Sequence, residues 1–234
     1  MNPYPESEPV PTGLTSAQLK YLSKYLSPSY LVPETLERLA GQFVAGSEVL
    51  MHNFLKPDVA NAIKAEVTKA DQEDYQPFSK DGKNLVPSHD LGESSEWKLE
   101  GPASKHRYLG LSSQKQSSAR TPTLSSVLNE LYPSSAFRAW LSVVSSLVPL
   151  AYRAEARRFR KGLDYTLANG EDKEGDSRLD AVLGLTWWAK EDADDEADDE
   201  QDVGGWEVSL FRGPSKDPRP RTDLCRFAVL FGIS

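Results

Sequence analysis

The chain has 234 residues, of which 38% are hydrophobic, and its formal net charge at pH 7 is −8. This length suits one large domain or two small ones, and the low hydrophobic share indicates that part of the chain forms unburied loops. Composition also excludes two classes of segment: no apolar run approaches the ~20 residues of a membrane helix, and the polar, proline-rich start is not a signal peptide.

The negative charge is concentrated in one block. Glu191–Asp202 contains nine carboxylates and no basic residue, so the rest of the chain has a net charge of +1. This balance gives no indication of a nucleic-acid-binding surface. We expect the acidic insertion 191–202 to be a solvated loop between two strands, because like charges repel and only two alanines could anchor it. The alternative is an electrostatic docking segment for a basic partner.

The single cysteine, Cys225, cannot form an internal disulfide. This fits a reducing compartment, and we expect a location in the cytoplasm, the nucleus or both. Because Cys225 lies in an apolar run, we expect it to behave as a small hydrophobic residue rather than as a reactive thiol.

We expect one domain over residues 14–234, preceded by a flexible tail over residues 1–13. The tail holds four prolines and two glutamates and has little to bury. Residues 72–118 show no hydrophobic period and are expected to be rich in loops. A connection of this length without structure is uncommon, so it leaves room for short strands. Its expected anchors are Trp97, Tyr108 and Leu109.

Helices are predicted in the first third of the chain. Thr15 or Ser16 can cap the first, and Pro33 can occupy the first position of the second. Glu48–Leu55 is typical of a short strand, and a third helix begins at Lys56–Asp58. The positions expected to face inward are Leu19, Leu22, Leu26, Leu36, Leu39, Ala40, Phe43, Val59, Ile63 and Val67.

Two further helices are predicted from Thr121 to Pro149, the second capped by Ser134 or Ser135. Strands follow, the first of them half-buried. Helices followed by strands indicate an α+β fold with helices packed on one sheet of a sandwich. The inward helix positions are Leu124, Val127, Leu128, Leu131, Phe137, Trp140, Leu141, Val144 and Val148. The expected strands are Ala151–Lys161, Tyr165–Leu167, Leu179–Trp188, Gly205–Phe211 and Leu224–Ile233.

Three segments in this order carry a family resemblance: Arg157–Gly170, Leu179–Trp188 and Asp202–Phe211. They resemble strands and turns of the double-stranded β-helix of iron- and 2-oxoglutarate-dependent prolyl hydroxylases. The run Arg-Arg-Phe-Arg-x-Gly-Leu-Asp-Tyr-Thr-Leu-Ala resembles the C-terminal domain of fungal and animal prolyl 3-hydroxylases, a group that includes the fungal termination-and-polyadenylation prolyl 3,4-dihydroxylase. Similar pieces earlier in the chain are Tyr30-Leu31, Gln42-Phe43 and Met51–Leu55.

The resemblance implies a double-stranded β-helix, or jelly-roll, with the N-terminal and central helices packed on it. Full-length members of the family carry a catalytic jelly-roll ahead of this domain, and we expect this chain to lack it. We also expect the domain to be truncated at its C-terminus, because the chain stops inside the apolar run Phe227–Ile233, where the neighbours of a last strand would be missing.

Iron(II) oxygenases bind their metal with two histidines and one carboxylate. In the frame Gly162–Gly170, the resemblance places Ala168 where the first histidine would fall and Gly170 where the carboxylate would fall. All three histidines precede the strands, and none has a carboxylate two residues later. We therefore expect no catalytic, cofactor-binding or metal-binding residue in this chain; Fe(II), 2-oxoglutarate and ascorbate are expected for the family's catalytic domain. The histidines are His52, His89 and His106, followed at +2 by Phe54, Leu91 and Tyr108.

The pair His89-Asp90, with Glu93 and Glu96 nearby, is the alternative metal site, since a carboxylate and a histidine in a loop can bind a metal. We favour solvated loop residues there, since no second histidine or cysteine is close. His52 is expected to be a packed or hydrogen-bonded residue. Motifs for phosphate loops, dinucleotide binding or a serine nucleophile are absent from the sequence.

Basic residues cluster on the first of the expected strands, on both of its faces. One interpretation is a protein-binding or interdomain surface; the other, which we favour, is charge pairing with Glu155, Asp164 or the acidic block. The cluster consists of Arg153, Arg157, Arg158, Arg160 and Lys161.

These observations predict a non-catalytic interaction domain with protein partners and without membrane or direct nucleic-acid contacts. By resemblance, it positions a substrate or docks translation-related proteins for a catalytic oxygenase domain in cis, which acts on a small-subunit ribosomal protein in the control of translation termination. The alternative is an active iron- and 2-oxoglutarate-dependent dioxygenase fragment with an atypical metal site. A third hypothesis is an acidic adaptor unrelated to oxygenases.

Overall fold

The computed structural model describes residues 2–4, 11–74, 90–112, 120–160, 163–167, 179–185, 207–212 and 226–233, the last two ranges as backbone only. The helices are α1 (Ser16–Leu22), the 3-10 helix η1 (Pro28–Leu31), α2 (Pro33–Gly46), α3 (Pro57–Asp74), α4 (Pro122–Ser126), the π-helical η2 (Val127–Leu131) and α5 (Ser135–Ser145). The strands are β1 (Asn2–Pro3), β2 (Glu48–Met51), β3 (Lys98–Glu100), β4 (His106–Ser112), β5 (Ala151–Phe159), β6 (Tyr165–Thr166), β7 (Leu179–Leu185), β8 (Glu207–Arg212) and β9 (Arg226–Ile233).

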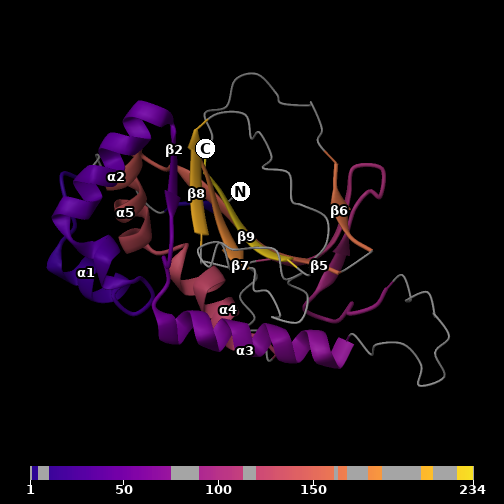
Figure 1. The fold of residues 1–234 in the computed structure, drawn as a ribbon. Coiled ribbons are helices and arrows are strands. Elements are labelled where there is room, and N and C mark those ends of the chain that lie inside the picture. The colour runs from indigo at the N-terminus through magenta and orange to yellow at the C-terminus, as the bar shows by residue number, and fades with distance from the viewer. Residues whose placement is uncertain are drawn as a thin grey trace, which may run out of the picture.

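One antiparallel sheet organises the described strands, in the order β2-β8-β7-β9-β5-β4-β3, with β1 beside β5 and β6 beside β4. Helices α1, α2 and α5 gather at the β2 side of the molecule, and α3 runs beneath the strands (Figure 1). The expected mixture of helices and sheet is therefore confirmed. The expected jelly-roll is not confirmed, because the described residues give one continuous sheet rather than two facing sheets.

The predicted helix starts are confirmed by their caps. Thr15 and Gln18 form a capping box, with the Thr15 hydroxyl accepting from the Gln18 amide and the Gln18 side chain accepting from the Thr15 amide. Pro33 occupies the first turn of α2, and the Ser134 hydroxyl accepts from the Phe137 amide at the start of α5. The helix from Pro122 differs from expectation, since it widens into the π turn η2, yet its predicted apolar positions remain buried.

Strands lie close to their predicted positions, with two differences. β2 ends at Met51 rather than Leu55, because the chain turns at Asn53, whose φ is 53°. The loop-rich segment 72–118 contains β3 and β4, and its predicted anchors Trp97, Tyr108 and Leu109 are all buried.

Both ends of the described chain join the sheet at Tyr152, which pairs with Asn2 of β1 on one side and with Ile233 of β9 on the other. The two ends accordingly lie close together in Figure 1. Residues 2–3, within the expected tail over residues 1–13, pair with β5. The expected lack of neighbours for the last apolar run is wrong, since β9 pairs with both β5 and β7.

The core lies between the helices and one face of the sheet. Phe54 and Phe137 both pack on Trp140, with ring centroids 5.2 Å and 5.9 Å away, and the Trp140 indole N–H donates to the Tyr30 carbonyl at 2.9 Å. These aromatic contacts join the loop after β2 to α5 and η1. Within the described part of the chain, no helix has the length and apolar character needed to cross a membrane.

Candidate functional site

Strand β5 carries most of the predicted basic cluster, and its two faces have different surroundings. Ala154, Ala156 and Arg158 are buried on the helix-facing side. Phe159 lies on the opposite side, with Arg157, because side chains alternate along a strand. The buried face therefore carries a charged guanidinium among small apolar residues.

Arg158 joins β5 to the last turn of α3. It is 2% exposed, and its Nε donates to Asp71 Oδ1 at 2.8 Å while Nη1 donates to Asp74 Oδ2 at 2.5 Å. Arg120 contacts the other oxygen of Asp74 at 2.9 Å. We call Arg158, Arg120, Asp71 and Asp74 the α3–β5 latch. Two arginines bridged by one carboxylate fix the end of the helix against the sheet.

The two carboxylates of the latch respond differently to their surroundings. Burial raises the pKa of Asp71, and the neighbouring Asp74 charge adds to this, so that the opposing effect of Arg158 is outweighed. Burial also raises the pKa of Asp74, but hydrogen bonds from Arg158 and Arg120 hold it below its usual value. Asp74 is therefore the firmly ionised partner of the two arginines.

Arg160 makes a second buried pair. Its backbone amide, Nε and Nη2 donate to the Asp164 carboxylate at 2.8, 2.7 and 2.7 Å, and its Nη1 donates to the Leu91 carbonyl. The Asp164 side chain is completely buried, and Arg107 lies 3.7 Å from it. This pair holds the end of β5 to the turn before β6.

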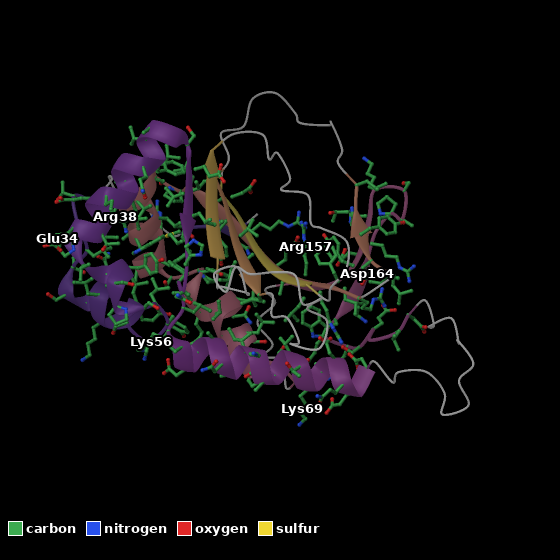
Figure 2. All side chains as sticks on the ribbon, viewed as in Figure 1. Glu34, Arg38, Lys56, Lys69, Arg157 and Asp164 are labelled. Carbon is green, nitrogen blue, oxygen red and sulfur yellow. The ribbon has the colours of Figure 1, made fainter. Side chains whose placement is uncertain are left out.

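The helix-free face of β5 carries a smaller charge network. Glu155 accepts from Arg153 at 3.0 Å and from Arg157 at 2.6 Å. Burial raises the pKa of Glu155, but the two arginines outweigh this effect and hold it below its usual range. The Arg157 guanidinium also lies 4.7 Å from the centroid of the Tyr108 ring. In Figure 2, Arg157 lies on the other side of β5 from α3.

The preferred interpretation of the basic cluster, charge pairing, is confirmed for Glu155 and Asp164. The partners in α3 were not predicted, because Asp71 and Arg158 are 87 residues apart and no local pattern links them. Among the described members of the cluster, Arg153 is the most exposed, with a side chain that is 69% exposed. The structure does not describe Lys161.

The two described histidines lie beside or in different strands, far apart in the sheet. His52 directly follows β2, while His106 begins β4 and pairs with Thr166. Five strand spacings separate β2 from β4 in the sheet order, which at ~4.8 Å each amounts to about 24 Å along the sheet. Figure 1 shows β2 and β6, the neighbour of β4, on opposite sides of the molecule. These histidines therefore cannot bind one metal ion together.

Other predicted positions have mixed outcomes. His52 is exposed rather than packed, although its carbonyl accepts a hydrogen bond from Tyr30 at 2.5 Å. Among the described residues, no group of three His, Cys, Asp or Glu side chains is arranged to hold a metal. The remaining predictions concern residues outside those that the structure describes: His89, Ala168, Gly170, Cys225 and the acidic insertion 191–202.

A surface hollow of about 450 Å³ lies between α1 and the start of α5. The Tyr21 hydroxyl donates to the Glu130 carbonyl at 2.8 Å on its wall, and Tyr25 donates to the Glu130 carboxylate beside it. Burial is the main effect that raises the pKa of Tyr25 to about 12, so its hydroxyl stays protonated. The hollow was not predicted, and its lining offers no paired acid and base: Ala17, Gln18, Tyr21, Glu130, Pro133, Ser134, Ser135 and Ala136.

Comparison with known proteins assigns the chain to a family. The family described as "Oxoglutarate and iron-dependent oxygenase degradation C-term" matches residues 17–223. The prolyl 3,4-dihydroxylase OGFOD1 of Ostreococcus tauri is 31% identical over 172 residues, which are 70% of this chain and 32% of that protein. The chain thus spans about a third of the length of this curated relative.

Among solved structures, a prolyl-4-hydroxylase from Pseudomonas putida matches with a TM-score of 0.49 and 11% identity, over 85% of this chain and 97% of the other. The family match covers most of the chain, from the second residue of α1 to beyond the end of β8. The family match agrees with the resemblance that the Arg157–Gly170 segment carries. The chain therefore belongs to the "Oxoglutarate and iron-dependent oxygenase degradation C-term" family.

Proposed function

We propose that this chain is a non-catalytic interaction domain that serves a prolyl hydroxylase of the 2-oxoglutarate- and iron-dependent class. In this proposal the domain docks protein partners, and a separate catalytic oxygenase domain carries Fe(II), 2-oxoglutarate and ascorbate. Family membership and the similarity to part of a prolyl 3,4-dihydroxylase support the assignment. The proposed substrate of the whole protein is a small-subunit ribosomal protein, and the proposed process is the control of translation termination.

The observation that carries the proposal is the placement of the histidines. An iron(II) oxygenase needs two imidazoles and a carboxylate on one face of the metal. The described residues do not fit such a site, because His52 and His106 are separated by four intervening strands. The residues that follow them at +2, Phe54 and Tyr108, are aromatic and buried.

An iron-binding assay tests the catalytic half of the proposal. The purified chain is titrated anaerobically with Fe(II) in the presence of 2-oxoglutarate, followed by calorimetry, and succinate is measured after oxygen is admitted. We expect no saturable iron site and no succinate above the protein-free blank. The full-length Ostreococcus tauri prolyl 3,4-dihydroxylase serves as positive control. One equivalent of bound iron with turnover would establish the active-fragment alternative instead.

A binding assay tests the docking half. The immobilised chain is exposed to purified small-subunit ribosomal proteins, with a variant in which Arg153 is replaced by glutamate as the matched control, because this side chain is outward-facing and its reversal spares the core. Saturable binding that is stronger for the natural chain than for the Arg153→Glu variant is expected if the helix-free face of β5, which carries Arg153, takes part. Absence of saturable binding to all of these proteins would remove the ribosomal partner from the proposal.

A further inference from the structure

We propose that the edge of β5 at Leu150–Tyr152, together with the pocket that receives Tyr4, is a binding site for an extended peptide with a Pro-Tyr sequence. The chain's own residues 2–4, which we call the strap, occupy this site and can be displaced from it. The proposal of this site does not depend on the docking role or the ribosomal partner proposed above.

The strap is held by backbone pairing and one side chain. β1 pairs antiparallel with Ala151-Tyr152, and the Tyr4 amide donates to the Leu150 carbonyl at 3.0 Å. The side chains of Asn2-Pro3 are exposed, whereas Tyr4 is 6% exposed. Main-chain pairing with one anchoring side chain in a pocket is the mode by which sheet edges recognise linear peptides.

The pocket is shaped for a tyrosine ring. The Tyr4 hydroxyl donates to the Tyr132 carbonyl at 3.2 Å, and its ring centroid lies 4.9 Å from that of Tyr152. The Arg138 guanidinium lies 5.0 Å from the Tyr4 ring centroid, a favourable cation–π distance. The combination of cation, ring and carbonyl acceptor favours an aromatic residue with a hydroxyl group over an aliphatic one.

The walls of this pocket are supported without the strap. Arg138 Nε donates to the Pro149 carbonyl at 2.8 Å, and the Tyr132 ring packs on Phe137 at 5.1 Å. Both contacts involve only α5, its flanking residues and the segment before β5. Removal of Tyr4 therefore leaves Arg138 and Tyr132 with partners of their own.

The edge is open to a short strand for a geometric reason. In the described residues, β4 pairs with β5 only from Glu155 to Arg158. On the β4 side of β5, residues 151–154 therefore extend beyond the end of β4. The opposite side of the same stretch pairs with β9. A peptide can therefore add beside Ala151-Tyr152 without disturbing β4 or β9.

The strap is short enough to be displaced. It contributes a two-residue strand, and Pro3 lacks the amide hydrogen that would add a further bond. Its advantage over a separate peptide is its tether, which raises its effective concentration at the site. A change that weakens the contact of Tyr4 should then expose the site to peptides in solution.

The test measures binding of a fluorescent peptide with the sequence of residues 1–10 to three full-length chains by anisotropy. These are the natural chain, Tyr4→Phe, which keeps the ring but loses the bond to the Tyr132 carbonyl, and Tyr4→Ala, which empties the pocket. We expect affinity to rise in that order, with Tyr4→Ala binding at least about tenfold more tightly than the natural chain, as loss of tethered competition predicts.

Two controls fix the location. A peptide with alanine in place of its tyrosine should not bind Tyr4→Ala, and a chain with Tyr21→Ala, altered outside the site, should bind like the natural chain. Equal affinities for the three chains, or no saturable binding to folded Tyr4→Ala, would overturn the proposal. So would unfolding of Tyr4→Ala, which would make Tyr4 part of the obligatory core. A natural dimer that Tyr4→Ala converts to a monomer would assign the strap to a second copy and overturn its occupancy in cis.

Discussion

Replacing Arg158 by methionine tests whether the α3–β5 latch stabilises the domain. The Arg158 side chain is 3% exposed, and its partners Asp74 and Asp71 are 15% and 27% exposed. The substitution preserves most of the aliphatic volume but leaves two partly buried carboxylates without their main cation. Breaking a buried ion pair from one side costs about 3–5 kcal/mol. Because Asp74 retains Arg120 and Asp71 has some access to water, we expect the lower end, about 3 kcal/mol.

Urea unfolding followed by tryptophan fluorescence gives the free energy of unfolding, and the matched control is Arg153→Met. Arg153 lies on the same strand and also pairs with a carboxylate, but it is 69% exposed. An exposed pair is worth at most about 1 kcal/mol. For a domain of this size, 3 kcal/mol corresponds to a fall of roughly 6–12 °C in melting temperature. Equal effects of the two substitutions would refute the assignment of Arg158 as a buried structural charge.

The triple variant with Arg158→Met, Asp71→Asn and Asp74→Asn separates lost attraction from stranded charge. Removing the carboxylates as well takes away the cost of leaving them unpaired. We expect this variant to recover part of the stability that Arg158→Met loses. If the triple variant instead loses as much free energy of unfolding as the three single substitutions added together, the attraction between the charges is the larger contribution.

Three further predictions address the titration of Asp74, the cap of α5, and the segment from residue 191 to Trp206. The pKa of Asp74 is lower in the folded state than in the unfolded state. The contribution of ionised Asp74 to the free energy of unfolding is therefore complete above the unfolded pKa of about 4 and is lost as the pH falls through the folded value. Asp74→Asn should accordingly reduce the loss of unfolding free energy between about pH 5 and pH 2, measured by urea titration at each pH. Ser134→Ala removes the hydroxyl that accepts from the Phe137 amide and should cost about 1 kcal/mol of unfolding free energy, whereas Ser134→Asp should retain it. Deletion of 191–202 should leave the melting temperature nearly unchanged, and a large fall would contradict this expectation. Trp206→Ala should lower the free energy of unfolding by about 3–5 kcal/mol if the ring is in the core, and an unchanged melting curve would contradict that placement.

The features that were predictable from the sequence are those with local causes. The caps at Thr15 and Ser134 and the proline at the start of α2 involve side chains within a few residues of the backbone they satisfy. The same holds for the ion pairs Arg153–Glu155 and Arg160–Asp164, whose members are two and four residues apart. The strand positions follow from alternation and turn residues.

The features that were missed are non-local. The sheet order places β9 between β5 and β7, a pairing that no spacing within the chain determines. Residues 2–4 have the composition of a tail, and they join the sheet only because β5 extends past β4 and a pocket receives Tyr4. The latch unites α3 and β5, which are far apart in sequence, so Arg158 could be read as a surface charge until the fold was known.

The run that carries the family resemblance has a structural explanation in this fold. Within Arg157–Gly170, Arg158 and Arg160 are almost completely buried and each is satisfied by carboxylates from a turn or helix. A lysine at either position could not make the same planar, multiply bonded contacts. The spacing of these arginines thus reflects how β5 is anchored to α3 and to the turn before β6. Similarity at these two arginines therefore supports a shared anchoring of β5, and the arginines themselves carry no information about catalysis.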